Sequence, residues 1–285
     1  MSNSLGELVT SVRRSLEGET DEPWWPGLAQ ALAQERDLRL PFENAEYSTS
    51  RFLGLGLPVS VLNVVPSSPG RIALRLEVME ASGNQRFADR CLQFVAENHI
   101  TVATGQAISA ATSLICLLPS LAQTVSALVR SVHILKSDDP GIDISFSDPL
   151  IPFSIFLSVS QGKDAGLRIA EAIIHETMHL QLSLVEQAVP LVLDDTMARF
   201  SPWKKKLRPL SGLIHALYVF RVIDTWLEKI SASTPDVPAV SRRRLQIAEE
   251  IAELDLTGTE AGFTQAGQAL MRGLLRSNDS FCRTC

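Results

Sequence analysis

Residues 164–188 read DAGLRIAEAIIHETMHLQLSLVEQA. This stretch has apolar residues at helical spacing, namely Ile169, Ile173, Leu180 and Leu184. The spacing predicts one long helix that is buried along one side. Asp164 is the candidate N-cap residue, and Pro190 follows the helix and ends it.

This helix carries the segment His175-Glu-Thr-Met-His179, which matches the motif His-Glu-x-x-His. A separation of four residues places both imidazoles on one helical face, one turn apart, where they can bind the same metal ion. The alternative interpretation is that both histidines are ordinary core or surface residues. We expect a divalent metal site, with Glu176 as the candidate catalytic residue.

Zinc and iron sites both need a third protein ligand. The long metzincin pattern is excluded because Leu182 and Val185 occupy its glycine and third histidine positions. Glu228 fits a gluzincin poorly, since no aspartate follows it at the usual spacing. His215 lies in an apolar helical segment in which a single histidine is unusual, and it is the preferred third ligand.

Two further residues are candidates for cofactor binding. Arg208 precedes His215 by seven residues, about two helical turns, so we expect both on one face of a helix that runs from Arg208-Pro209 to about Ile230. A guanidinium is a suitable two-pronged donor to a carboxylate. Ser158 offers a hydroxyl for the same purpose. Glu171 is expected to orient His175, whereas Glu186 lies too far along the helix to share the ion.

The rest of the chain predicts an α+β fold, predominantly helical, with a small sheet next to the metal-binding helix. Residues 132–135, 142–146 and 153–159 are short and rich in strand-forming residues, and turn sequences separate them. Residues 71–80 are ambiguous, because Ile72, Leu74, Leu76 and Val78 alternate like a strand whereas Ser68-Pro69 is typical of a helix start. We expect a helix there. The chain of 285 residues is expected to form a single domain, helical over about residues 1–130 and metal-binding over about residues 131–285.

Composition narrows the class of protein. The net charge is −6 and no long basic run is present, so nucleic acid is not an expected partner. The uncharged stretch 101–129 is interrupted by Gly105 and Pro119, which argues against a membrane span. The start of the chain lacks the features of a secretory signal, so we expect a cytoplasmic protein. Cys282 and Cys285 form a single Cys-x-x-Cys pair, which is a weak redox or metal signal.

The residues alone leave two chemistries open. With zinc, Glu176 would be the general base that activates water, and the reaction would be hydrolysis of a peptide or amide. With iron(II), the remaining coordination positions could hold a chelating 2-oxo acid and O₂, and an arginine, lysine or hydroxyl group would bind the distal carboxylate. A third possibility is a non-catalytic protein that binds a precursor peptide and keeps the motif as a structural site.

A family resemblance helps to choose between these chemistries. The His-Glu-Thr-Met-His helix, followed by Ser201-Pro-Trp-Lys and by the segment from Arg208 to His215, resembles His-Glu-x-x-His proteins that are encoded beside bacterial clusters for ribosomally made, modified peptides. The segments 147–158 and 256–262 are also similar to that family. The resemblance covers about residues 143–274. Alanine follows His215, where that family commonly has glycine.

Members of that family are regarded as iron-using, 2-oxoglutarate-dependent peptide β-hydroxylases. The resemblance therefore implies hydroxylation of a side-chain β-carbon in a ribosomally made precursor peptide, with Fe(II), 2-oxoglutarate and O₂ as the other reactants. By position, it implies that His175, His179 and His215 bind iron and that Arg208 binds the co-substrate carboxylate. The precursor peptide could be bound through a leader segment, and the sequence leaves this open.

Overall fold

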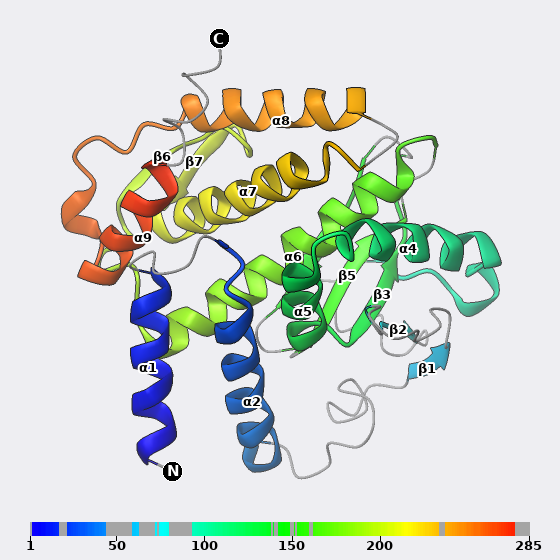
Figure 1. The fold of residues 1–285 in the computed structure, drawn as a ribbon, viewed down its shortest axis with the longest axis horizontal. Coiled ribbons are helices and arrows are strands. Elements are labelled where there is room, and N and C mark those ends of the chain that lie inside the picture. The colour runs from blue at the N-terminus through cyan, green and yellow to red at the C-terminus, as the bar shows by residue number, and fades with distance from the viewer. Residues whose placement is uncertain are drawn as a thin grey trace.

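The computed structural model describes residues 2–16, 22–43, 59–62, 72, 74–79, 93–137, 139, 142–148, 151, 153–159, 162–233 and 237–276. Within these ranges the chain is mainly helical, with one five-stranded sheet and one two-stranded sheet. Figure 1 shows α6 crossing the middle of the molecule, with the sheet beside it. The predicted α+β fold, predominantly helical with a small sheet next to the helix that carries the His-Glu-x-x-His motif, is confirmed.

The central helix α6 spans Ala165–Ala188, close to the predicted range. It is buried on more than one side, because it packs against α4 (Val102–Ile115), α5 (Pro119–Leu128) and α7 (Leu210–Ile230). Ile169, Ile173 and Met178 have no exposed surface. Asp164 is the N-cap residue, but its side chain makes no capping hydrogen bond. Packing rather than capping therefore holds the helix in place.

The larger sheet has the order β1-β2-β3-β5-β4 and is mixed. Its strands are β1 (Val59–Leu62), β2 (Arg75–Met79), β3 (Ser131–Leu135), β4 (Ser145–Ser147) and β5 (Ser154–Ser158). β2–β3 and β3–β5 are parallel, and the outer pairs are antiparallel. The sheet lies beside α6, which packs against β4 and β5.

The helix expected over residues 71–80 is wrong, since this segment contains β2. Ile72, Leu74 and Leu76 are buried, and their alternation is the period of a strand. β2 pairs with β1 on one side and with β3 on the other, so both edges of its backbone find partners. The period of two, together with this pairing, outweighs the helix-start signal upstream.

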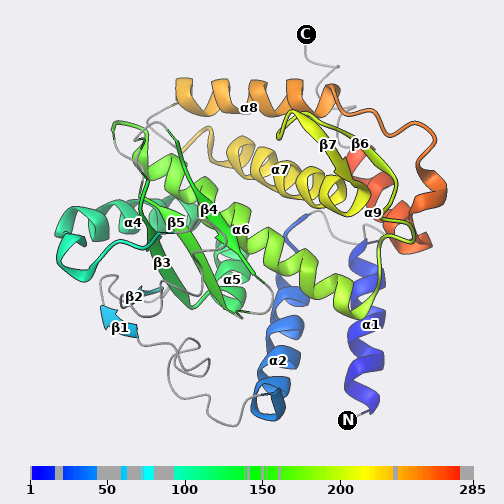
Figure 2. The same ribbon diagram turned by 180° about the vertical axis from the view of Figure 1, so that it is seen from behind.

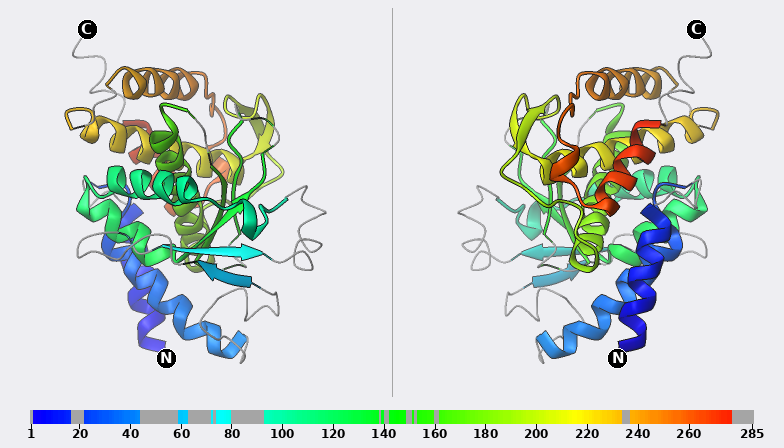
Figure 3. Two further views of the ribbon diagram at one scale, coloured as in Figure 1. Left: turned by 90° about the vertical axis from the view of Figure 1, so that its right-hand side faces the viewer. Right: turned by 90° about the vertical axis from the view of Figure 1, so that its left-hand side faces the viewer.

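The remaining helices surround this centre. They are α1 (Ser2–Leu16), α2 (Pro26–Glu43), α8 (Val237–Ala252), α9 (Gln265–Arg276) and the short 3₁₀ turns η3 (Glu97–His99) and η4 (Glu260–Gly262). Figure 3 shows α8 at one end of the molecule and the α1–α2 pair at the other. The Cys282–Cys285 pair lies outside the described residues.

The segment before α7 differs from the prediction. Arg208 does not lie on the helix with His215, because β6 (Ala198–Ser201) and β7 (Lys206–Pro209) form a hairpin and α7 begins only at Leu210. Pro209 is the N-cap residue of α7, with extended backbone angles. A proline suits both the first helical turn and the residue just before a helix, so the sequence signal placed the boundary too early. Figure 2 shows the hairpin beside α7.

α7 is the only described helix that is long and apolar enough to cross a membrane, judged by length and composition. However, 67% of its most apolar window is buried inside the molecule. Such burial is typical of a core helix in a soluble protein. The cytoplasmic location stays a prediction.

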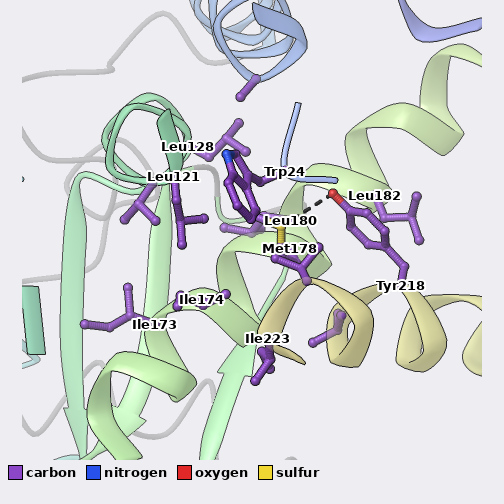
Figure 4. Packing of buried hydrophobic residues seen from close by; sticks show 14 of the residues in the cluster. Trp24, Leu121, Leu128, Ile173, Ile174, Met178, Leu180, Leu182, Tyr218 and Ile223 are labelled. Carbon is purple, nitrogen blue, oxygen red and sulfur yellow. Dashed lines mark hydrogen bonds between the residues drawn. The ribbon is translucent and has the colours of Figure 1, made fainter. Parts of the chain in front are cut away.

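A buried polar cluster fixes α6 against α7 and the N-terminal segment. Figure 4 shows Tyr218 of α7 among the buried side chains around it, with its hydroxyl directed at the sulfur of Met178 on α6. The Tyr218 hydroxyl donates to Gln181 Oε1 at 2.8 Å and also lies 3.0 Å from the carbonyl of Pro23, and Gln181 Nε2 donates to the carbonyl of Trp24 at 3.1 Å. Trp25 stacks on Tyr218, with ring centroids 4.9 Å apart. Since both tryptophans are buried, this segment packs the core and offers no free aromatic surface.

Candidate metal centre

α6 and α7 bring the three predicted ligands together. His175 Nε2 lies 3.2 Å from His179 Nε2. His179 Nδ1 lies 3.3 Å from His215 Nδ1, and the two rings are nearly parallel. Two nitrogen ligands that each lie about 2.0–2.1 Å from one zinc ion are about 3.0–3.4 Å apart, so the Nε2 atoms of the motif fit a shared ion.

His215, the third candidate ligand, is less well placed to share an ion with the motif histidines. His215 approaches the other ring nitrogen of His179, not the Nε2 atom that faces His175. Within the described residues, no group of three or more His, Cys, Asp or Glu side chains has the mutual geometry of a closed metal site. The donor chemistry and the spacing of the first two histidines fit a metal, and ligation by His215 stays a prediction.

The two histidines of the motif are held neutral by their surroundings. Burial lowers the pKa of His175 to about 4, and the positive charges of Lys204 and Arg243 act in the same direction. Burial also lowers the pKa of His179 to about 3, with a further contribution from His175. Imidazole binds a metal through the lone pair of its neutral form. Both residues of the motif are therefore in the ligating form at neutral pH.

Glu176 is buried, with 3% of its surface exposed, and both of its carboxylate oxygens are occupied. Ser145 Oγ donates to Oε1 and Ser147 Oγ donates to Oε2, each at 2.6 Å. Its Oε1 lies 3.9 Å from His175 Nε2. The glutamate thus joins α6 to β4 next to His175. The serines were not predicted, because only the paired β4 strand brings them to this helix.

Glu186 has a role that the sequence analysis did not foresee. Its Oε2 lies 2.8 Å from His215 Nε2, across the α6–α7 interface. A hydrogen bond to the carboxylate needs a proton on Nε2, which leaves Nδ1 of a neutral ring with the lone pair. Carboxylates commonly orient metal-binding histidines in this way. Glu186 is too far along α6 to join the histidine pair as a ligand, yet it reaches the ring of the third candidate.

Arg208 lies close to the histidines although it is on β7. A Cβ atom added at Gly212 would lie 2.9 Å from Cζ, Nε and Nη2 of Arg208, so the guanidinium lies directly over the first turn of α7. Its charge is among the influences that lower the pKa of His179, after burial and the nearer histidines. The predicted proximity of Arg208 to the site therefore holds, by a different route through the chain.

Lys204 and Arg243 place positive charge on the other side, beside His175. Arg243 Nε donates to both carboxylate oxygens of Glu171, at 2.8 and 3.0 Å. Glu171 is thereby committed to α8 and does not orient His175 as expected. Lys204 is exposed at the turn of the hairpin. It makes no ion pair with another residue of the described chain, so it is the freer of the two cations.

An aromatic wall closes the site next to His175. Phe220 meets the His175 ring edge to face, with centroids 5.5 Å apart. Trp203, from the hairpin, stacks on Phe220 at 5.2 Å, and the Arg243 guanidinium lies 5.4 Å from the Phe220 ring centre. The hairpin is therefore anchored to α7 at the site itself, and it contributes Lys204 and Arg208 from this anchored position.

Ser158 is not brought to the histidines by any described contact. Its hydroxyl accepts a hydrogen bond from the backbone N–H of Ile144 at 2.9 Å. It lines a separate cavity of about 240 Å³ together with His99. Its side chain holds β4 against β5, and cofactor binding by Ser158 has no support from this geometry.

Comparison with known proteins adds no assignment. No family model matches the chain, and no curated protein matches its sequence. The resemblance to the peptide-modifying His-Glu-x-x-His proteins therefore stays a prediction from the motifs quoted above.

Proposed function

We propose that this protein is an iron(II)- and 2-oxoglutarate-dependent hydroxylase that acts on a side-chain β-carbon of a ribosomally made precursor peptide. The observation that carries the proposal is the presence of two cations, Arg208 and Lys204, beside a pair of neutral imidazoles that can share one ion. A metal next to cations suits 2-oxoglutarate as co-substrate, and this co-substrate implies an oxidation such as hydroxylation.

The histidines supply the metal ligands. His175 and His179 present Nε2 atoms at ligand spacing, and His215 stands next to His179 on the facing helix. With iron(II) held there, the chemistry supplied would be oxidation of a peptide C–H bond to C–OH by O₂, with 2-oxoglutarate converted to succinate and CO₂. The protein binds and orients the reactants, and the aromatic wall of Phe220 and Trp203 keeps water from one side of the site.

A cation near the histidines is the second feature that supports the proposal. 2-Oxoglutarate carries a distal carboxylate that needs a positively charged partner beyond the metal. Arg208 lies over Gly212 and within electrostatic reach of His179, and its planar fork can bind a carboxylate through two hydrogen bonds. A zinc hydrolase does not require such a cation, whereas a 2-oxo diacid does.

The surroundings of Glu176 also favour the oxygenase. A general base in hydrolysis needs a carboxylate oxygen free to take a proton from water. Here Ser145 and Ser147 already donate to the two oxygens. The residue therefore acts as an anchor between α6 and β4, which agrees with a reaction that does not use it as a base. The motif resemblance supports a peptide as the prime substrate.

The test is succinate formation and oxygen consumption by anaerobically prepared protein that is given iron(II), 2-oxoglutarate and then O₂. We expect succinate from the intact protein and none from His175→Ala. Arg208→Ala should raise the 2-oxoglutarate concentration needed for half-maximal turnover, while Arg242→Ala, an exposed arginine on α8, serves as the matched control. Stoichiometric zinc, with no absorbance band on adding iron and 2-oxoglutarate, would refute the proposal.

The second candidate is a zinc-dependent peptide hydrolase that uses Glu176 as general base. It is favoured by one observation, namely that Glu176 Oε1 lies only 3.9 Å from His175 Nε2. The variant Glu176→Gln separates the two functions. It abolishes hydrolysis because an amide cannot take the proton, and it leaves oxygenase turnover in any folded fraction. Metal binding without turnover of any peptide would point to a non-catalytic peptide-binding protein.

A further inference from the structure

The hairpin beside the site has one face made only of apolar side chains. Its register pairs Ala198 with Pro209 and Phe200 with Leu207, and side chains alternate between the two faces of a strand. These four residues therefore share one face. Leu207 is 69% exposed and Phe200 is 45% exposed, so the face is open to solvent. We call it the hairpin face.

The same hairpin is strongly basic. Between residues 198 and 209 it has no acidic residue and five cations, which are Arg199, Lys204, Lys205, Lys206 and Arg208, in a chain whose net charge is −6. Lys205 pairs with Glu253 at 3.1 Å. Lys204 and Lys206 are exposed, and neither forms an ion pair within the described part of the chain. The positive charge at the turn of the hairpin and on the opposite face of β7 is thus available to a partner.

The hairpin also has free strand edges. Among the described strands, β6 and β7 pair only with each other, so each has an outer edge with unpaired backbone groups. An extended peptide can add to such an edge through main-chain hydrogen bonds, while its side chains occupy apolar positions on the face. Exposed apolar patches rimmed by polar residues commonly mark interaction sites.

We propose that the hairpin face binds an extended, acidic segment of the substrate peptide, with apolar side chains of that segment against Phe200 and Leu207. Charge complementarity selects the acidic segment, because alternate side chains of a strand added beside β7 lie on the face of Lys206, and Lys204 is exposed at the turn. The position of the hairpin selects the substrate peptide, because Trp203 and Arg208 connect the same hairpin to the histidines. This inference rests on the proposed function in taking the occupant to be the substrate.

The test uses two fluorescently labelled synthetic peptides of equal length. Both alternate leucine and valine with polar positions, which are aspartate in one peptide and lysine in the other. We expect the aspartate peptide to bind the intact protein at least about tenfold more tightly in fluorescence anisotropy, and to lose affinity as salt is added. The double variant Phe200→Ser/Leu207→Ser should weaken its binding by about tenfold or more.

Val102→Ser is the matched control, since Val102 is 78% exposed and lies on α4, away from the hairpin in Figure 2. Circular dichroism and thermal unfolding show whether each variant is folded. Equal binding of both peptides, or unchanged binding by a folded double variant, overturns the proposal. A dimer in light scattering that the double variant converts to a monomer also overturns it, because a second copy would then be the occupant. Succinate formation, measured separately without peptide, distinguishes failure of this inference from failure of the proposed function.

Discussion

The hydrogen bond between Glu186 and His215 gives a sharp test of the metal centre. Replacing Glu186 by alanine removes the acceptor at 2.8 Å from His215 Nε2 without touching either histidine of the motif. The ring of His215 then loses the group that fixes its tautomer and its orientation. If His215 is the third ligand, this loss must appear in the affinity for the metal.

The expected size follows from the kind of contact. Removing a carboxylate that orients a metal-binding histidine lowers metal affinity by about 10- to 100-fold, or about 1.4–2.7 kcal/mol. The lower part of this range is expected here, because the side chain of Glu186 is 26% exposed and water can replace part of the hydrogen bond. The side chain of His215 is only 13% exposed, so the effect does not vanish.

The assay is competition between the metal-free protein and a chromophoric chelator for Co(II), which also gives an absorption spectrum of the site. Glu186→Gln retains an acceptor oxygen and should recover part of the affinity lost in Glu186→Ala. Gln187→Ala, an exposed neighbour on the same helix, is the control and should behave as the unmodified protein. Unchanged Co(II) affinity and spectrum in a folded Glu186→Ala protein would refute the assignment of His215 as a ligand.

Three more predictions concern stability and the co-substrate. The double variant Ser145→Ala/Ser147→Ala removes both donors from the buried Glu176 and should lower the free energy of unfolding by about 3 kcal/mol in urea titrations. Gly212→Ala should raise the 2-oxoglutarate concentration for half-maximal succinate formation, because its methyl group displaces the Arg208 guanidinium 2.9 Å away, while the added helix propensity preserves stability. Burial lowers the pKa of His133 from its ordinary value of 6.5 to about 3 in the folded protein. The unfolded chain therefore takes up the proton at a higher pH than the folded protein does. As a result, the free energy of unfolding falls as the pH drops from about 6.5 towards about 3. Between about pH 7 and about pH 5, the free energy of unfolding of His133→Gln should therefore fall by about 2 kcal/mol less than that of the unmodified protein, as measured by urea titration at each pH. An equal fall in both proteins would contradict this account.

The sequence predicted the parts of the structure that depend on local periodicity. α6 was predicted almost to its ends, because the apolar period and Pro190 are local signals. The two histidines of the motif also lie on the helix predicted for them, and His215 lies beside them on α7. It failed at residues 71–80 and at Arg208, where a proline-based helix signal competed with strand pairing. Pairing depends on partners far away in sequence, so such short segments cannot be assigned from their own residues.

The contacts that complete the site were also beyond the sequence. The spacing of Glu186 from the histidine pair predicts that it is not a shared ligand, but spacing along one helix says nothing about contacts with another helix. Its actual partner, His215, comes from the facing helix. Ser145 and Ser147 likewise reach Glu176 only because β4 lies beside α6. Periodicity tells which face of a helix a residue occupies, and only tertiary packing tells what that face meets.

The geometry of the candidate metal centre therefore depends on how α6 and α7 are aligned. Gln181 and Tyr218 form a buried hydrogen bond at 2.8 Å, and each lies within one turn of the histidine on its own helix. A buried polar pair is costly to leave unsatisfied, so it penalises any shift of one helix along the other. The same shift would separate His179 from His215 and break the bond to Glu186. The polar cluster around Tyr218 thus stabilises the one alignment in which the three histidines are neighbours.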